Sequence, residues 1–188
     1  MPFPSTLFLD RDGVINFRPP AAYVTQWSEF HFLAGVLEAL ALLAPLAARI
    51  LIVTNQQGIG KGLMTEAGLR ALHDSMLQEI EGAGGRIDGV YHCPDLAAKP
   101  NNCRKPAPDL ALRAQRDFPD IDFADSLMVG DSLSDLQFGR QLGMQVALIT
   151  SDAESRQLAL EHPESYDLCF SSLLELVRSL RSSLHDQF

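Results

Sequence analysis

The sequence predicts an α/β fold in which helices cover both faces of a parallel sheet. Short apolar runs alternate with longer segments of helical periodicity along most of the chain, and this alternation is typical of βα units. The runs are continuously apolar, as expected for strands that are buried on both faces. With 188 residues, 46% of them hydrophobic, the chain is long enough to bury a core without disulfides or a structural metal.

Each expected element follows from a local pattern. The expected strands are the apolar runs at 7–9, 50–53, 89–91, 127–129, 146–149 and 168–170. The helices expected between and after them lie near 35–47, 65–82, 107–118, 132–142, 154–161 and 172–184. Thr65 is a start signal for the second helix, and Ser132 or Ser134 is expected to cap the fourth.

Two segments, 16–32 and 94–106, show neither pattern and are expected to be loops. The chain has no internal repeat and no linker rich in Pro, Gly or Ser. We therefore expect a single domain over residues 1–188.

Charge and cysteine content limit the partners and the compartment. The formal net charge is −9, from 24 acidic and 15 basic residues, which disfavours binding to nucleic acid or to an anionic membrane. The three cysteines, an odd and sparse set, favour a reducing compartment. The N-terminus lacks a basic signal-peptide region, and the longest apolar stretch, 33–48, is too short to span a bilayer. We expect a cytoplasmic monomer.

Polar residues follow the apolar runs at the points where a parallel sheet binds its ligand, beyond the carboxyl ends of its strands. The first run is followed by Asp10-Arg11-Asp12-Gly13, the second by Thr54-Asn55-Gln56 and the fourth by Gly130-Asp131-Ser132, while Arg104-Lys105-Pro106 precedes the third helix. Each cluster alone could be a turn, a helix cap or a solvated side chain. Together they place three carboxylates, a hydroxyl and an ammonium at one sheet edge, where like charges repel unless a cation and an anion bind between them.

These groups suit phosphoryl transfer. Carboxylate oxygens are ligands for Mg²⁺, which also binds phosphate oxygens. A carboxylate can attack phosphorus to form an aspartyl-phosphate, and a second acid two residues further on can protonate the leaving oxygen. A hydroxyl, backbone N–H groups and a lysine can hold the equatorial oxygens as charge builds on them.

The same residues resemble the four motifs of the haloacid dehalogenase (HAD) superfamily. The motifs correspond here to residues 8–16, 53–56, 105–106 and 130–135, in that order. Within the superfamily, the chain looks most like the D-glycero-D-manno-heptose 1,7-bisphosphate 7-phosphatases and the related histidinol-phosphate phosphatases. The phrases at 54–62 and 103–106 are close to theirs.

The resemblance implies a Rossmann-like three-layer sandwich without a cap domain, so that loops 16–32 and 94–104 must shape an open pocket. It implies roles for the following residues: Asp10 as nucleophile, Asp12 as general acid/base, Thr54 and Lys105 on the transferring phosphoryl group, Asp135 orienting Lys105, and Asp10, the main chain of Asp12 and Asp131 around Mg²⁺. Asn55, Gln56, Lys61 and Arg104 are expected to meet the rest of the substrate.

The chain departs from the heptose enzymes at two places. They usually carry a Cys-x-His and a Cys-x-Cys that bind a structural Zn²⁺, whereas only Cys93 and Cys103 remain here. The two thiols are then either a zinc remnant completed by Asp95 or His92, or free. The second departure is Ser132, where the heptose enzymes often present a lysine to the substrate, and its loss weakens the case for a second phosphate.

The sequence therefore favours a Mg²⁺-dependent phosphomonoesterase that acts on a small phosphorylated metabolite, either the heptose bisphosphate or a close sugar phosphate. Histidinol phosphate is an alternative substrate. A 3′-phosphorylated polynucleotide is another, and the net charge of −9 argues against it. A phosphate-binding module without turnover is an alternative of another class. The presence of every catalytic residue type argues against it.

Overall fold

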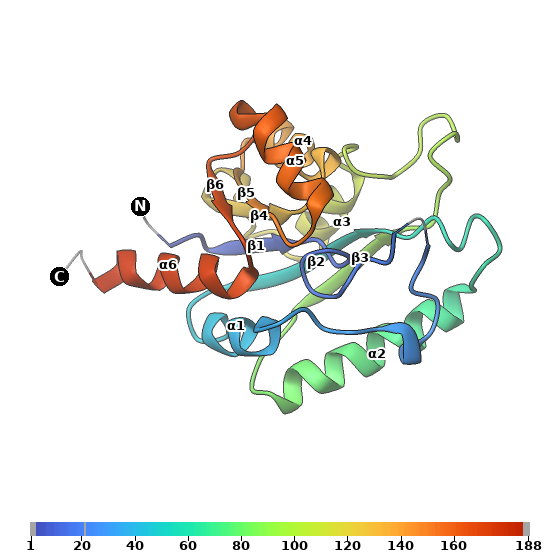
Figure 1. Cartoon of the computed structure of the whole chain (residues 1–188), viewed down its shortest axis with the longest axis horizontal. Helices are drawn as coiled ribbons and strands as arrows, with labels where there is room; N and C mark the ends of the chain where they lie inside the picture. The colour runs from blue at the N-terminus through green and yellow to red at the C-terminus, as the bar shows by residue number, and fades with distance from the viewer. Residues whose placement is uncertain (1–2, 21, 186–188) are drawn as a thin grey trace.

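The computed structural model describes residues 3–20 and 22–185 and contains a six-stranded parallel sheet (Figure 1). The strands are β1 (Thr6–Leu9), β2 (Arg49–Asn55), β3 (Gly89–Cys93), β4 (Ser126–Gly130), β5 (Gln145–Ile149) and β6 (Leu168–Phe170). They lie in the order β3-β2-β1-β4-β5-β6, and each neighbouring pair is parallel. The predicted α/β class and the six predicted strands are confirmed.

The strand order reverses at the centre of the sheet. After β1 the chain adds β2 and β3 on one side, then returns to place β4 on the other side of β1. In this register Leu9 of β1 pairs with Ile52 of β2 and Val129 of β4. The residues that follow these three central strands therefore meet at one sheet edge, at the topological switch point where ligands bind in open α/β sheets.

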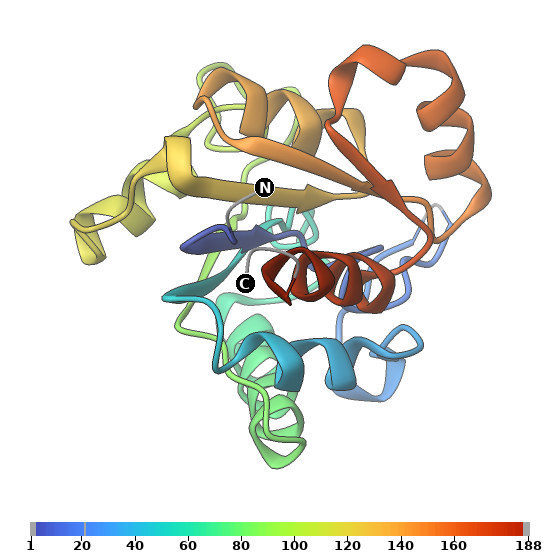
Figure 2. The same ribbon diagram turned by 90° about the vertical axis from the view of Figure 1, so that its left-hand side faces the viewer.

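Helices cover both faces of the sheet. They are α1 (Val36–Leu43), α2 (Glu66–Gly82), α3 (Asp109–Asp117), α4 (Leu133–Gln141), α5 (Ala153–Glu161) and α6 (Leu173–His185). Figure 2 shows α1, α2 and α6 on one side and α3, α4 and α5 on the other, and the hydrophobic clusters divide in the same way. Thr65 caps α2 by accepting a hydrogen bond from Gly68 N at 3.0 Å, and Ser132 is the N-cap of α4.

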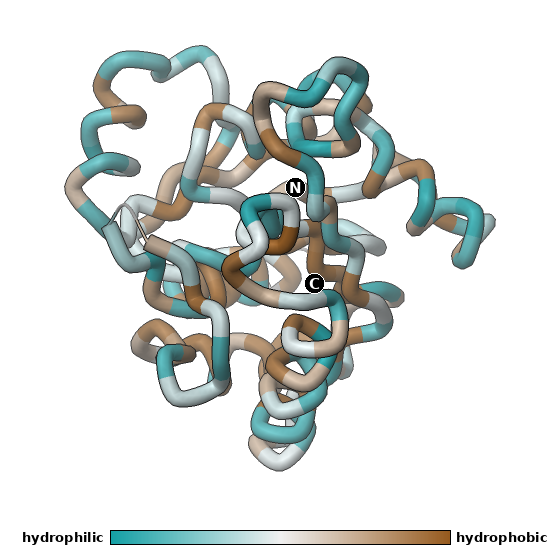
Figure 3. Tube along the Cα trace, turned by 90° about the vertical axis from the view of Figure 1, so that its right-hand side faces the viewer, coloured by the Kyte–Doolittle hydropathy of each residue, from teal (hydrophilic) through white to brown (hydrophobic). Residues whose placement is uncertain are grey.

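The central strands form the core. Every residue of β1 and β4 is buried, because helices lie on both faces. Along the chain trace in Figure 3, hydrophobic segments run through the interior while hydrophilic segments occupy the outer turns. Burial of this kind fixes the ends of β1 and β4 rigidly, which is the condition for holding charged side chains in defined positions.

The long loops carry little secondary structure. Between β1 and α1 the described residues hold one 3-10 turn, Trp27–Glu29, and two isolated β-bridges that pair Asn16 with Asp12 and with Phe32. The described residues between β3 and α3 hold no helix or strand. The described part of the chain therefore inserts no cap domain over the sheet edge. None of the helices within residues 3–20 and 22–185 combines the length and apolar character required to cross a bilayer.

Candidate active site

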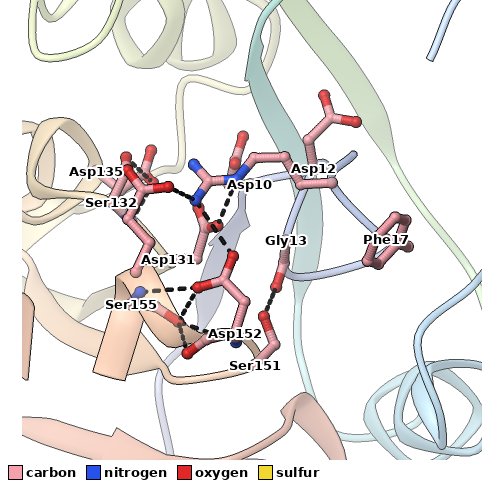
Figure 4. Close-up of polar contacts among 12 residues, drawn as sticks. Asp10, Asp12, Gly13, Phe17, Asp131, Ser132, Asp135, Ser151, Asp152 and Ser155 are labelled. Carbon is pink, nitrogen blue, oxygen red and sulfur yellow. Dashed lines mark hydrogen bonds and ion pairs between the residues drawn. The ribbon is translucent and has the colours of Figure 1, made fainter. Parts of the chain in front are cut away.

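Three buried carboxylates lie together at the switch point. Asp10 follows β1, Asp131 follows β4, and Asp135 lies in the first turn of α4. Each offers a carboxylate oxygen within 4.8 Å of the others, and Figure 4 shows the three side chains close to one another. Their exposed fractions are 7% or less. Three carboxylates so near one another in the protein interior repel unless cations lie between them.

Lys105 supplies one such cation. Its Nζ is 2.7 Å from Asp10 Oδ1, 2.6 Å from Asp135 Oδ1 and 2.7 Å from the carbonyl oxygen of Val53. The backbone of Lys105 is held by Asn55, which accepts from Lys105 N at 2.9 Å and donates to Lys105 O at 3.2 Å. The structure thus brings together Asp10, Asp131, Lys105 and the end of β2. The side chain of Asn55 aligns the loop that carries Lys105.

The electrostatics of the cluster follow from burial and from these neighbours. Burial raises the pKa of Asp10 to about 7, with further raising by Asp135 and Asp12, although Lys105 opposes the shift. Burial, Asp10 and Asp135 likewise raise the pKa of Asp131 well above its usual range. Burial alone would lower the pKa of Lys105, but Asp10 and Asp135 outweigh it and raise the value. The ammonium is therefore charged, and the carboxylates lack sufficient positive charge around them.

Asp131 has room for a metal ion. Its Oδ2 is buried and accepts no hydrogen bond from any described residue, and the nearest cationic atom is Arg18 Nε at 3.5 Å. A buried carboxylate oxygen without a donor is costly unless it binds a cation. Gly13 keeps this space open, because a Cβ built on it would lie 1.9 Å from Asp131 Oδ2. Hard oxygens of Asp10 and Asp131 at this spacing fit Mg²⁺.

Asp12 has a different environment from that of Asp10. Arg11 Nη2 donates to both of its carboxylate oxygens at 2.9 Å, Asn16 Nδ2 donates to Oδ1 at 2.9 Å, and Gln56 Nε2 donates to Oδ2 at 2.8 Å. Burial raises the pKa of Asp12, but the Arg11 charge and the hydrogen bonds outweigh it, so that the pKa lies below its usual value. Gln56 Nε2 also donates to Thr54 Oγ1 at 2.8 Å, which ties the hydroxyl at the end of β2 to Asp12.

A pocket of about 270 Å³ opens onto this cluster. The predicted residues that line it are Asp10, Asp12, Thr54, Asn55, Gln56, Arg104, Lys105, Asp131 and Asp135. Lys61 is not among them, and its Nζ lies 5.1 Å from the ring centroid of Tyr23 instead. Tyr23 itself lines the pocket, and its hydroxyl accepts a hydrogen bond from Gln57 Nε2 at 2.8 Å.

Arg18 lines the pocket as well, and sequence reasoning missed it. Besides its contact with Asp131, its Nη2 lies 3.3 Å from Asp152 Oδ2 and 2.8 Å from Glu154 Oε2, at the start of α5. Its side chain is 28% exposed, so it stands at the wall of the pocket. Because Arg18 lies in a loop without periodicity and far in sequence from its partners, no local signal distinguishes it from a solvated arginine.

The cysteine loop differs from both expectations. Cys93 and Cys103 form a disulfide, with Cα atoms 5.6 Å apart, so neither the free-thiol alternative nor a zinc site with two thiolate ligands matches this structure. The physical reason is that loop 94–102 returns to the end of β3 and brings the two cysteines within bonding range. Asp95 lies beside them and accepts from Cys103 N at 3.2 Å. The disulfide also removes two of the three cysteines from the argument for a reducing compartment.

Known proteins resemble this chain in sequence. A HAD-hydrolase-like family model matches residues 102–176, which include Lys105 and Asp131. D-glycero-alpha-D-manno-heptose-1,7-bisphosphate 7-phosphatase from Mycobacterium bovis is 42% identical over 136 residues, 72% of each sequence. The chain belongs to the heptose-1,7-bisphosphate 7-phosphatase family. Another member, the D-glycero-beta-D-manno enzyme from Photorhabdus laumondii, is 33% identical over 184 residues, 93% of this chain and 94% of that one.

Solved structures of heptose bisphosphate phosphatases share the fold. The crystal structure of D,D-heptose 1,7-bisphosphate phosphatase from B. bronchiseptica, complexed with magnesium and phosphate, matches with a TM-score of 0.86 and 32% identity. The alignment covers 95% of this chain and 99% of that one. As a member of this HAD-like family, the protein is a Mg²⁺-dependent phosphatase with a Rossmann-like parallel sheet, as the sequence predicted.

Proposed function

We propose that the protein removes the 7-phosphate of D-glycero-D-manno-heptose 1,7-bisphosphate or of a close sugar bisphosphate. The observation that carries this proposal is the distribution of cations in the pocket. Lys105 is buried beside Asp10, whereas Arg18 and Arg104 line the same pocket at less buried positions. One buried cation suits the phosphoryl group that is transferred, and two guanidinium groups suit a second phosphate. Arg18 can provide a charge that Ser132 lacks if the second phosphate replaces its contact with Glu154, whose carboxylate is exposed.

Asp10 is the proposed nucleophile. Its carboxylate attacks phosphorus and forms an aspartyl-phosphate, while the bond from phosphorus to the sugar oxygen breaks. Lys105 and the Thr54 hydroxyl hold the equatorial oxygens, and Asp135 keeps the Lys105 ammonium aligned through its 2.6 Å contact. Mg²⁺, held by Asp10, Asp131 and the main chain of Asp12, neutralises charge on the phosphoryl oxygens when it is bound.

Asp12 is the proposed general acid and base. It is ionised in the free site because Arg11 lowers its pKa. An anionic phosphate bound beside it raises its proton affinity, so that it can take up a proton and give it to the leaving sugar oxygen. The carboxylate that remains is then placed to accept a proton from the water that hydrolyses the aspartyl-phosphate. Cleavage of the aspartyl-phosphate returns Asp10 to the carboxylate, and Asp12 returns to its ionised state when it releases the proton taken from water to the solvent as phosphate leaves.

The test is phosphate release from a panel of phosphorylated metabolites in Mg²⁺, with both anomers of heptose 1,7-bisphosphate, histidinol phosphate and a 3′-phosphorylated oligonucleotide included. Relatives are named for either anomer, so both are needed. The Asp10→Asn variant serves as the blank. We expect the highest kcat/KM for one heptose anomer, with the phosphate lost from C7. A higher value for histidinol phosphate would overturn the substrate proposal and leave the aspartyl-phosphate chemistry standing.

Localisation in the cytoplasm and a monomeric state stay predictions from the sequence. Gel filtration with light scattering would test the second of these directly.

A further inference from the structure

Arg11 follows the proposed nucleophile directly and touches no reacting group in the proposed reaction. It is completely buried, in spite of its size. Its Nη2 makes the two 2.9 Å contacts with the carboxylate of Asp12. The Nε of Arg11 is buried without a hydrogen-bond partner among the described residues, so the orientation of the guanidinium depends on the acceptors of Nη2 and Nη1.

His73 provides an acceptor from another part of the fold. It lies on α2, and its Nε2 is 3.1 Å from Arg11 Nη1. A guanidinium has no acceptor atom, so Nε2 must accept the hydrogen bond and the ring proton must be on Nδ1. Burial and the Arg11 charge lower the pKa of His73 to about 3, which is consistent with a neutral ring that accepts. The contact joins α2 to the turn after β1.

We infer that His73 is a positioning residue for Asp12 and acts through Arg11. The inference rests on the proposed function, in which Asp12 donates the proton to the leaving group. Without an acceptor at position 73, Nη1 of a buried cation would lose its partner, a cost that the guanidinium can reduce by rotating. Because the same guanidinium holds both oxygens of Asp12, its rotation moves the carboxylate away from the leaving oxygen. Displacements of this size reduce proton transfer strongly.

His92 offers a matched comparison. It lies near His73, with ring centroids 6.3 Å apart, and both histidines line a second cavity of about 310 Å³ between α2 and β3. The Nε2 of His92, however, is 2.9 Å from Glu66 Oε2, and within the described part of the chain no hydrogen bond joins its ring to Arg11. A substitution of His92 therefore alters the same cavity and leaves the contacts from His73 to Arg11 and from Arg11 to Asp12 in place.

Two substrates with different leaving groups distinguish a misplaced general acid from a general loss of structure. A sugar alkoxide must be protonated as its bond to phosphorus breaks, whereas p-nitrophenolate is a stable anion that leaves without a proton. The decisive quantity is the ratio of kcat/KM for the alkyl ester to kcat/KM for p-nitrophenyl phosphate. This ratio reports the first half of the reaction, and it does not depend on what fraction of the enzyme is folded.

The experiment measures this ratio for the wild type and for His73→Leu, His73→Gln, His92→Gln and Asp12→Asn. We expect His73→Leu to lower the ratio about tenfold, because general acid catalysis contributes roughly 10²–10⁴-fold and is weakened, not abolished. His73→Gln should recover most of the ratio, since its amide oxygen can accept from Arg11. His92→Gln should leave the ratio unchanged, and Asp12→Asn should lower it most.

A ratio for His73→Leu equal to that of the wild type would overturn the inference, and so would an equal fall in His92→Gln. If the heptose bisphosphate is not hydrolysed, the ratio is measured with the best alkyl ester of the panel. The substrate proposal then fails, while the inference about His73 is still tested. Absence of turnover with every ester would overturn both.

Discussion

The pocket has two walls of different origin. The buried side is built by residues at the ends of β1, β2 and β4, where strands covered by helices on both faces fix the backbone. The opposite side is built by two loops, the described residues of segments 17–20 and 22–24 and the segment 94–104. These residues belong to no helix or strand. The buried side carries the residues proposed for phosphoryl transfer, and the loop side carries the contacts proposed for the second phosphate.

Sequence patterns place residues correctly on the buried side and less well on the loop side. On the buried side, Asp10, Asp12, Lys105 and Asp131 line the pocket as predicted, because each follows or precedes a strongly patterned element. On the loop side, Arg18 was missed and Lys61 lies against Tyr23. If the buried side carries out phosphoryl transfer and the loop side selects the substrate, changes on the two sides should have different effects.

The largest effect is expected at the nucleophile. Asp10→Asn should lower kcat by at least about 10³-fold, because an amide does not attack phosphorus, while the fold is kept. Phosphate release and thermal melting by circular dichroism measure the two properties. Asp120→Asn, an exposed carboxylate 3.1 Å from Arg49, is the control and should leave kcat unchanged. Substantial turnover in Asp10→Asn would mean that another group attacks phosphorus.

The second effect is on the metal. Gly13→Ala should weaken Mg²⁺ binding by roughly 10–100-fold, because the new Cβ would displace the Asp131 carboxylate. Gly143→Ala is a matched control, since Gly143 also has a positive φ, of 76°, but no atom lies within 4 Å of its added Cβ. Both variants should lose stability from backbone strain, and Gly13→Ala should lose more because its Cβ also collides with Asp131. Calorimetric titration with Mg²⁺ should separate them, and equal affinities would contradict the placement of the ion.

The third effect is on specificity. Arg18→Gln should raise KM for the heptose bisphosphate about tenfold and leave KM for the heptose 7-phosphate nearly unchanged, because a charge-assisted hydrogen bond to the second phosphate is lost. Lys61→Gln should change neither value, since Lys61 does not line the pocket. Steady-state kinetics with both esters make the comparison. An increase in KM for Lys61→Gln instead would return substrate binding to the position that the sequence predicted.

The fourth effect concerns the loop side alone. Reduction of the Cys93–Cys103 disulfide should lower the free energy of unfolding by roughly 2–3 kcal/mol in the chain-entropy account of a short closed loop. Amide hydrogen exchange should increase in residues 94–104 and stay slow in β1 and β4. Thiol titration of the oxidised protein should find one free cysteine, Cys169. Three free thiols together with bound zinc would favour the metal site that the sequence left open.

The smallest effect is expected in the dependence of the free energy of unfolding on acid pH. Burial and the Arg11 charge lower the pKa of His73 to about 3 in the folded protein from its ordinary value of 6.5, so the unfolded chain binds the proton more readily. Its contribution to stability is therefore full above pH 6.5 and is lost as the pH falls towards 3. Between pH 7 and pH 5, the wild type should lose about 1–2 kcal/mol more than His73→Gln. Urea unfolding at both pH values measures the difference, and parallel curves would contradict it.

The sequence by itself determined the α/β class, the six strands and the residues at their carboxyl ends. These follow from local information, because continuous apolar runs specify buried parallel strands, and because Asp10, Asp12 and Asp131 lie directly after two of them. The switch point then brings such residues together in any sheet of this order. The resemblance of these phrases to HAD motifs added the expected chemistry.

Only the tertiary structure decided which side chains complete the site from a distance. His73 meets Arg11 across 62 positions of the chain, and Arg18 meets Glu154 across 136. The disulfide between Cys93 and Cys103 likewise depends on the path of the loop between them. None of these contacts has a periodic signal, because loop direction and helix packing are set by the sum of many distant interactions and not by the residues that finally touch.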